Sequence, residues 1–270
     1  MNKKIGFIGC GNMAKAIIGG LIKSELVLPS DIIASAASEK NLNIVKESYG
    51  ISTSTNNIDA AKFSDILILA VKPNMYASVI EEIKEYIKDD PIVVTIAAGI
   101  TIDSVEKNFG KKLKVVRTMP NTPALVGEGM SALCANDLVT EDELKIVLSI
   151  FESFGKTEVI NEKLMDAIPA ISGSSPAYIY ILIEALADGG VMQGIPRDKA
   201  YKLAAQSVLG SAKMVLETGI HPGALKDNVC SPGGTTIDAV ATLEEKGFRS
   251  AIISAMQSCT KKAIEMSKKN

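Results

Sequence analysis

The stretch IGFIGCGNMA, residues 5–14, decides the fold of this chain. Its apolar start predicts a short buried strand. The pattern G-x-G-x-x-A at residues 9–14, followed by an alanine-rich helical segment, predicts a tight turn into a helix. In that setting Gly9 permits the turn, Gly11 lets the backbone approach a pyrophosphate, and Ala14 keeps the helix close to the strand. Because free N–H groups at a helix start suit an anion, the segment predicts a dinucleotide-binding α/β domain.

Apolar runs without polar alternation recur along the first half of the chain, which is typical of strands buried on both faces of a parallel sheet. We expect strands at residues 4–9, 31–35, 66–71, 92–97 and 115–118, with further strands at 131–135 and 156–160. Helical patterns separate them at residues 13–23, 39–49, 75–88 and 102–109, and a capping-box sequence at residues 140–143 predicts a helix to about residue 153. Residues 1–162 are therefore expected to form a doubly wound, Rossmann-like domain.

From residue 163 to residue 270 the alternation stops, and every periodic segment predicts a helix. Ser175-Pro176 has the form of a helix start, with proline at the first helical position. Further helices are expected from residue 195 to residue 217, with Gly219 as the stop, and over residues 236–246 and 249–267. Because these helices are apolar on several faces, we expect this all-α domain to bury them against a partner subunit.

Composition and charge argue against several classes of protein. The 270 residues are 47% hydrophobic and 22% charged, which is ordinary for a globular protein. The net charge of −2 includes no basic block that would favour nucleic acid or an anionic membrane. Neither a disulfide scaffold nor a metal site is expected, because no C-x-x-C pair occurs among the four cysteines, which are Cys10, Cys134, Cys230 and Cys259.

The sequence also predicts a cytoplasmic location. The N-terminal lysine pair leads straight into an expected strand, so no signal peptide is predicted. The most apolar later stretch, residues 177–191, contains Glu184 and Asp188, and we expect it to be too short and too polar to span a bilayer.

The end of the second expected strand bears on the choice of dinucleotide. An NAD site usually has Asp or Glu there to bind the ribose hydroxyls. Here residues 34–38 read Ala-Ser-Ala-Ala-Ser, and Lys40 follows. The hydroxyls of Ser35 and Ser38 and a nearby ammonium suit a 2′-phosphate, so NADPH is favoured and NADH stays possible. The alternative is a polar turn in which Ser38 caps the next helix.

Three more loops follow strand ends at the same edge of the sheet, where ligands bind in open α/β sheets. We expect them to line the nicotinamide half of the site; their residues are Ala70, Val71, Lys72 and Pro73, then Ala97, Ala98 and Gly99, and finally Asn121. Lys72 could instead be an ordinary surface charge, and Asn121 an ordinary turn residue.

One loop of the helical half differs from an ordinary connection between two helices. Residues 226–236 read Lys-Asp-Asn-Val-Cys-Ser-Pro-Gly-Gly-Thr-Thr. Free backbone N–H groups and two hydroxyls at the start of the following helix can hold a carboxylate. The plain alternative is a capped turn with Thr235 or Thr236 as the N-cap, and both readings are compatible.

These segments together resemble the pyrroline-5-carboxylate reductase family over essentially the whole chain. The resemblance is carried by residues 8–14, 70–73, 97–99, 119–123, 172–178 and 187–190, and most specifically by residues 225–244. One departure is Ser175, which stands at a helix start where many members have glycine.

The resemblance implies hydride transfer from NAD(P)H to the C=N carbon of Δ1-pyrroline-5-carboxylate, which gives L-proline in the last step of proline biosynthesis. It also implies an interlocked dimer built by the helical domain, and often a ring of dimers. On this basis Asn12 and Met13 would contact the cofactor at the start of the first helix, and Asn57 would lie against the adenine ribose.

The resemblance further implies the substrate contacts. Thr236 would hydrogen-bond the ring nitrogen as the catalytic residue, and the substrate carboxylate would be held by Ser231, Gly234 and Thr235, with Asn228 and Glu162 lining the site. Such a reaction needs little acid–base chemistry, because the imine is readily protonated and the protein's main task is alignment.

Two alternatives remain open at this point. A β-hydroxyacid dehydrogenase-like oxidoreductase would share the N-terminal pattern, but that family uses a lysine on a helix of the second domain, and residues 173–178 contain none. A non-catalytic NADP-binding sensor would need the glycines but not the loop at residues 231–236. Oxidation of NADPH with pyrroline-5-carboxylate would separate all three.

Overall fold

The structure is a computed structural model that describes residues 1–268. The chain divides into two compact units, one formed by Met1–Ser174 together with the chain from Ser258 onward, the other by Ser175–Gln257. The second unit is thus inserted between two segments of the first. The domain boundary that the sequence predicts, between residues 162 and 163, stays a prediction.

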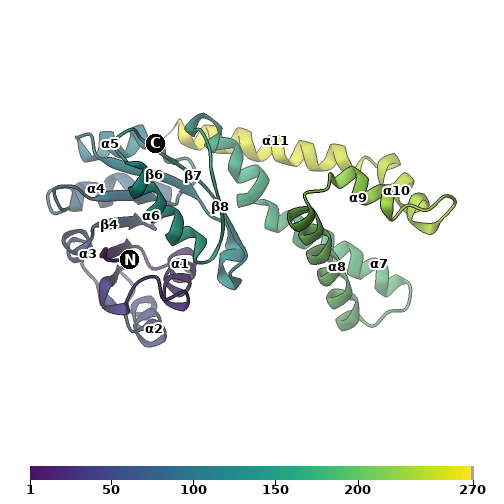
Figure 1. Cartoon of the computed structure of the whole chain (residues 1–270), viewed down its shortest axis with the longest axis horizontal. Coiled ribbons are helices and arrows are strands. Elements are labelled where there is room, and N and C mark those ends of the chain that lie inside the picture. Colours follow the sequence, from purple (N-terminus) through teal and green to yellow (C-terminus); the bar gives the residue numbers. More distant parts are fainter. Residues whose placement is uncertain (269–270) are drawn as a thin grey trace. The chain divides into compact units, whose positions relative to one another are not determined.

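The first unit is built on one eight-stranded sheet with the order β3-β2-β1-β4-β5-β6-β7-β8 (Figure 1). Its strands are β1 (Ile5–Ile8), β2 (Ile32–Ser35), β3 (Ser52–Ser54), β4 (Ile66–Leu69), β5 (Ile92–Thr95), β6 (Lys114–Met119), β7 (Gly129–Ala135) and β8 (Gly155–Val159). All neighbouring pairs are parallel except β6 and β7, which are antiparallel. The order from β3 to β6 is that of a doubly wound dinucleotide-binding fold, which confirms the expected fold class.

Helices cover both faces of this sheet. They are α1 (Asn12–Lys23), α2 (Glu39–Tyr49), α3 (Asn57–Phe63), α4 (Tyr76–Ile83), α5 (Ile102–Phe109) and α6 (Glu141–Glu152). Strand β4 shows how the two cores form: Ile66 and Ile68 belong to one buried cluster, and Leu67 and Leu69 to the other. Successive side chains of a strand point to opposite faces, so each of these fully buried residues contributes about 1.5–3 kcal/mol on its own side.

Several local details differ from the expectations. The capping box is confirmed, because the Thr140 hydroxyl accepts the Glu143 N–H and the Glu143 carboxylate accepts the Thr140 N–H. Helix α4 ends at Ile83, earlier than expected. Strand β3 and helix α3 were not predicted, because both are short and β3 is an all-polar edge strand (Ser-Thr-Ser) without an apolar period.

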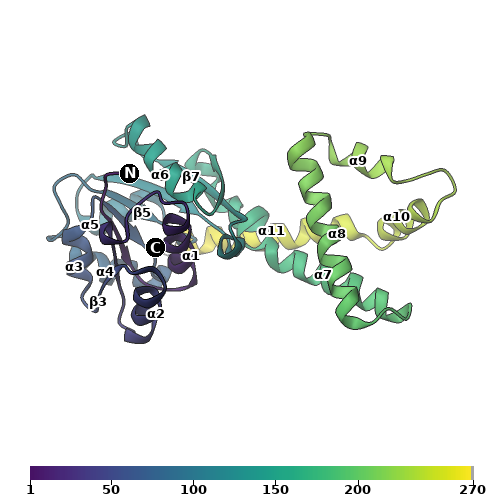
Figure 2. The ribbon, with the colours of Figure 1, turned by 60° about the horizontal axis from the view of Figure 1, so that its bottom comes forward.

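The second unit contains α7 (Ser175–Met192), α8 (Arg197–Thr218), α9 (Pro222–Asn228), α10 (Thr235–Glu245) and the first part of α11 (Phe248–Ser267). Helices α7 and α8 pack against each other (Figure 2) through small residues, with Ala187, Ala200 and Ala204 buried. Gly219 ends α8 in the left-handed conformation, as expected. Helix α9 was not predicted from the sequence, and its last three residues fall in the segment 226–236 that was expected to be a loop.

Two further features lie near the start of α7. A 3₁₀ segment, η4 (Glu162–Ala167), and a π-helical turn, Pro169–Gly173, precede the helix. The chain is therefore already helical before Ser175, where the sequence predicted the helix to start. The combined helical run Pro169–Met192 is long and apolar enough to cross a membrane by length and composition alone, a criterion that core helices of soluble proteins also meet, so it does not overturn the expectation for residues 177–191.

Candidate functional site

The glycine turn after β1 brings two of the predicted loops together. Gly9 has φ 99°, and a Cβ there would lie 2.4 Å from the carbonyl oxygen of Ala70, so only glycine fits. The Gly9 N–H donates to the Ser35 carbonyl at 2.8 Å, and the Ala70 N–H donates to the Ile8 carbonyl at 2.7 Å. The ends of β1, β2 and β4 therefore meet at one point of the sheet edge.

The start of α1 is open. Gly11 is the N-cap with φ −81°, no side chain caps the helix, and its first turn contains no acidic residue. A Cβ at Gly11 would find nothing within 4 Å among the described residues, so glycine here leaves open space beside the backbone rather than relieving a clash. Gly11 and Asn12 are exposed and Met13 is half-buried. A 12-residue helix with a bare N-terminus and a free approach fits a bound pyrophosphate.

Ser35 corrects the sequence interpretation of the ribose end. Its side chain is 0% exposed, and its hydroxyl bonds the Asn57 side-chain oxygen at 2.9 Å and the Phe7 carbonyl at 3.3 Å. The Asn57 amide nitrogen in turn donates to the Glu82 carboxylate at 2.9 Å. Ser35 therefore orients Asn57 and has no face for a 2′-phosphate, because a fully buried hydroxyl cannot meet a ligand. The exposed groups at this strand end are Ser38 and Lys40.

A buried polar chain lies beneath the next two loops. The Tyr76 hydroxyl donates to the Leu69 carbonyl at 2.7 Å and lies 2.8 Å from the Thr95 hydroxyl. The Thr95 carbonyl accepts the Thr118 hydroxyl at 2.9 Å. These bonds join the carboxyl ends of β4, β5 and β6, and burial raises the pKa of Tyr76 far above its usual range. Above β4, Lys72 is exposed, while Ala70, Val71 and Pro73 are half-buried.

Both polar ends of the Asn121 side chain form hydrogen bonds within the protein. Its amide nitrogen donates to the Ser172 carbonyl at 3.0 Å, and its amide oxygen accepts the Met130 N–H at 2.9 Å. Asn121 is buried and ties the end of β6 to β7 and to the π-helical turn. Contact with a cofactor through this side chain is not supported, because both of its polar ends already have partners.

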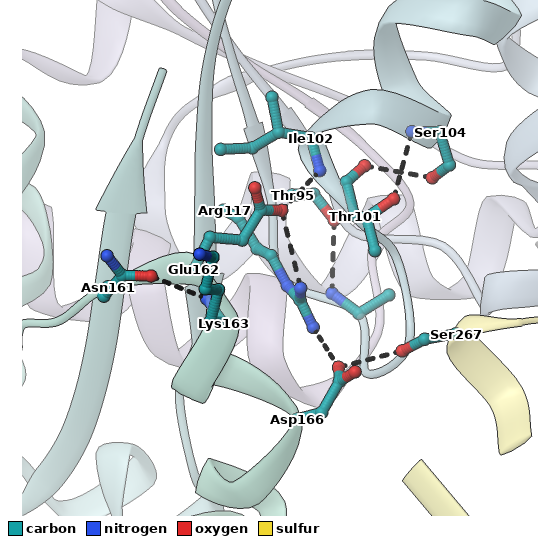
Figure 3. A network of polar contacts seen from close by, with 11 residues as sticks. Thr95, Thr101, Ile102, Ser104, Arg117, Asn161, Glu162, Lys163, Asp166 and Ser267 are labelled. Carbon is teal, nitrogen blue, oxygen red and sulfur yellow. Dashed lines mark hydrogen bonds and ion pairs between the residues drawn. The ribbon is translucent and has the colours of Figure 1, made fainter. Parts of the chain in front are cut away.

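Glu162 belongs to a cluster that sequence reasoning missed (Figure 3). Its carboxylate accepts the Ile102 N–H at 2.8 Å, at the start of α5, and lies 3.5 Å from the Arg117 guanidinium. Arg117 also contacts Asp166 at 2.6 Å, and Asp166 accepts the Ser267 hydroxyl at 2.8 Å. The signal was present in the sequence: an arginine inside the buried strand β6 (Lys-Val-Val-Arg-Thr-Met) requires a buried acidic partner.

The glycine-rich loop of the second unit ends at an uncapped helix. Gly234, not Thr235 or Thr236, is the N-cap of α10, and no side chain caps it. A Cβ at Gly234 would lie 2.4 Å from the Ser231 hydroxyl oxygen. Ser231 and Thr235 are exposed and Thr236 is half-buried. The residues predicted for the carboxylate therefore lie together at this helix start, and Asn228, the last residue of α9, precedes Ser231 by three positions in the chain.

Comparison with known proteins identifies the family. Residues 162–266 match the family model for pyrroline-5-carboxylate reductase dimerisation, and residues 4–99 match that for NADP oxidoreductase, coenzyme F420-dependent. The pyrroline-5-carboxylate reductase of Escherichia coli is 52% identical over 99% of this chain and 100% of its own length. The chain belongs to the pyrroline-5-carboxylate reductase family.

Solved structures agree with this membership. A pyrroline-5-carboxylate reductase from Coxiella burnetii superposes with a TM-score of 0.92 at 37% identity, and 99% of each chain is covered. The Plasmodium falciparum pyrroline carboxylate reductase, solved with NADP bound, gives a TM-score of 0.89 at 34% identity, with 98% of each chain covered. The resemblance noted from the sequence is confirmed, and so is the fold.

Proposed function

We propose that this chain catalyses the NAD(P)H-dependent reduction of Δ1-pyrroline-5-carboxylate to L-proline. Full-length similarity to reductases of that name supports the reaction. The observation on this chain that supports it most directly is the open N-terminus of α1 beside Gly9 and Gly11, which a dinucleotide pyrophosphate fits.

The first unit would hold the dinucleotide by its own backbone. The N–H groups of Asn12 and Met13 would bind the pyrophosphate, and Asn57, fixed by Ser35, would contact the adenine ribose. The nicotinamide half would lie against the loops after β4 and β5, at residues Ala70 to Pro73 and Ala97 to Gly99. When bound, the reduced nicotinamide supplies the hydride for the C=N carbon.

The second unit would hold the substrate. At the uncapped start of α10, the N–H group of Thr235 and the hydroxyl of Ser231 would bind the carboxylate beside Gly234, whose own N–H donates to the Ser231 carbonyl at 3.0 Å. The Thr236 hydroxyl would hydrogen-bond the ring nitrogen, with Asn228 beside it. We keep Glu162 as a structural partner of α5 rather than a substrate contact, because its carboxylate already binds the Ile102 N–H and Arg117.

The helical unit would bury its exposed apolar side chains in a dimer interface. Its exposed large apolar side chains include Tyr180, Ile181, Leu186, Met192, Leu203, Leu209, Met214 and Leu216. A face of this kind is typical of an obligate interface of roughly 2,000 Å² or more. A further ring of dimers and a cytoplasmic location are also part of this proposal, as is the absence of nucleic-acid or membrane partners.

NADPH is the proposed preferred cofactor, with NADH also accepted. The exposed end of β2 offers Ser38 and Lys40, and a hydroxyl and an ammonium favour a 2′-phosphate. Glu39 lies between them, exposed at the start of α2.

The deciding experiment measures loss of NADPH absorbance with the purified protein and Δ1-pyrroline-5-carboxylate, with L-proline identified by mass spectrometry. Turnover to proline is expected. Binding of NADPH without turnover would instead support the sensor reading, and oxidation of a β-hydroxyacid would support the dehydrogenase reading.

A further inference from the structure

The loop between β5 and α5 is held to the protein at both flanks. On one flank the Thr95 hydroxyl accepts the Ala97 N–H at 3.5 Å, and on the other the Glu162 carboxylate accepts the Ile102 N–H at 2.8 Å. The α5 helix is separately capped, since the Thr101 hydroxyl oxygen accepts the Ser104 N–H at 3.0 Å. Glu162 is therefore not needed as a cap and instead fixes where the loop ends.

The middle of the same loop is packed against the last turn of α11. Gly99 has φ 75°, and a Cβ there would lie 2.9 Å from the Cβ of Met266. Ser267, the next residue, donates its hydroxyl to Asp166 at 2.8 Å. Residues 258–268 belong to the same compact unit as the sheet, so this contact is internal to the first unit.

Arg117 contacts both carboxylates that anchor these segments, Glu162 and Asp166 (Figure 3). Its guanidinium contacts Asp166 at 2.6 Å and Glu162 at 3.5 Å, and the residue is only 4% exposed. An arginine is always charged, and its rigid fork presents several donors in fixed directions. The charge-assisted hydrogen bond from Arg117 to Asp166 is of the strong kind, and the longer ion pair to Glu162 attracts the second carboxylate to the same guanidinium. From Arg117, one path of contacts reaches the loop through Glu162 and Ile102, and the other through Asp166 and Ser267.

We propose that Arg117 is a positioning residue for the nicotinamide half of the cofactor site, and that the last turn of α11 is part of the same device. The inference rests on the proposed function for the identity of the ligand. Arg117 and its partners set the position of residues 97–101, and those residues in turn set where the nicotinamide ring can lie. The adenosine end would instead be formed around Ser35 and Asn57, whose side chains bond each other at 2.9 Å.

Hydrogen exchange of the ligand-free protein tests whether Arg117 and its partners restrain the loop after β5. Asp166→Asn removes one of the two carboxylate charges that face Arg117, and Ser267→Ala removes only the hydrogen bond from α11 to Asp166. Both are expected to speed amide exchange in residues 97–104 and to leave residues 9–14 and 32–38 unchanged. Asp103→Asn is the matched control, because Asp103 is also on α5 but pairs at 2.6 Å with Lys107 of the same helix in an exposed ion pair.

Binding tests the consequence for the site. NADPH is compared with 2′-phospho-ADP-ribose, a fragment that lacks the nicotinamide ring, by calorimetry below the unfolding temperature of each variant. Asp166→Asn and Ser267→Ala are expected to weaken NADPH binding by about 3–10-fold and to change fragment binding by less than about twofold. Asp103→Asn should change neither affinity.

Failure of this proposal and failure of the proposed function give different results. Unchanged exchange in residues 97–104, or an equal loss of affinity for NADPH and the fragment, would overturn the positioning role. A wild-type protein that binds neither ligand would overturn the proposed function, while the exchange data would still decide whether Arg117 and α11 hold the loop.

Discussion

The two compact units bury very different amounts of apolar surface. In the first unit both faces of the sheet are covered, with large side chains such as Phe7, Phe151 and Ile68 fully buried. Across Ser175–Gln257, all of which the structure describes, the buried side chains are three alanines, while many large apolar ones are exposed. Since burial of apolar area is what stabilises a fold, we expect the first unit to depend on its own core and the second to depend on burial against a partner subunit.

The largest effect should come from a buried charge of the first unit. Arg117→Met leaves Glu162 and Asp166 partly buried without their cation, and we expect a loss of about 3–5 kcal/mol in the free energy of unfolding. Arg197→Met, which removes an exposed pair with Asp188 in the second unit, should change the free energy of unfolding far less, because water and salt screen an exposed ion pair. Denaturant unfolding measures both. If the two variants lost similar free energies of unfolding, the difference proposed here between the two units would be wrong.

Catalysis should depend on a hydroxyl of the second unit. Thr236→Val keeps the shape of the side chain, and we expect kcat/KM to fall about 10–1,000-fold, or roughly 1.4–4 kcal/mol. NADPH affinity should not change, because that site lies in the first unit. Thr242→Val on the same helix is the control, since the Thr242 hydroxyl binds only the Asp238 carbonyl. Near-normal steady-state turnover in Thr236→Val would show that the ring nitrogen has another partner.

Exposed apolar residues should matter only in the second unit. Ile181 on α7 is 65% exposed, and Ile181→Lys is expected to raise the dimer dissociation constant about 10–100-fold, or roughly 1.4–2.7 kcal/mol. Leu28 in the first unit is similarly exposed, at 67%, and Leu28→Lys should leave the dimer intact. Light scattering over a dilution series measures both. A stable, active monomer of the wild type would refute the requirement for a partner.

The smallest predicted effect concerns the ribose end. Ser38→Asp should lower the preference for NADPH over NADH about tenfold, because a carboxylate repels the 2′-phosphate. Ser35→Asp, in contrast, would put a charge where the side chain is fully buried, so it should lower the unfolding temperature rather than switch the preference. If Ser38→Asp leaves the ratio of the two kcat/KM values unchanged, the 2′-phosphate is recognised elsewhere.

The sequence predicted the elements whose pattern is local. The capping box at Thr140, the helix stop at Gly219 and the glycine turn at Gly9 all depend on residues that are close in the chain. The antiparallel placement of β7 and the burial of Ser35 could not be predicted, because each depends on pairings between distant segments. Helix α9 was missed because it is short and begins at the proline of a turn-like His-Pro-Gly sequence.

The candidate site divides in the same way. Gly9, Gly11 and the loop around Gly234 were found because glycine at fixed spacing marks a backbone that must approach something closely. Arg117 was missed because its partners, Glu162 and Asp166, are more than forty residues away in the chain, at separations that no local pattern reveals. The hydrogen bonds of Asn121 to Ser172 and Met130 were missed for the same reason.

The return of α11 to the first unit has a consequence for biosynthesis. A ribosome makes the sheet first, but Met266 and Ser267, which meet Gly99 and Asp166, emerge only after the entire inserted helical unit has been made. Domains generally fold in the order of synthesis, so a nascent chain has its sheet long before the loop after β5 is fully held. The loop after β5, which we propose lies against the nicotinamide, is thus among the last parts of the enzyme to reach its final contacts, and a chain released early has the glycine turn after β1 but lacks the contacts from α11.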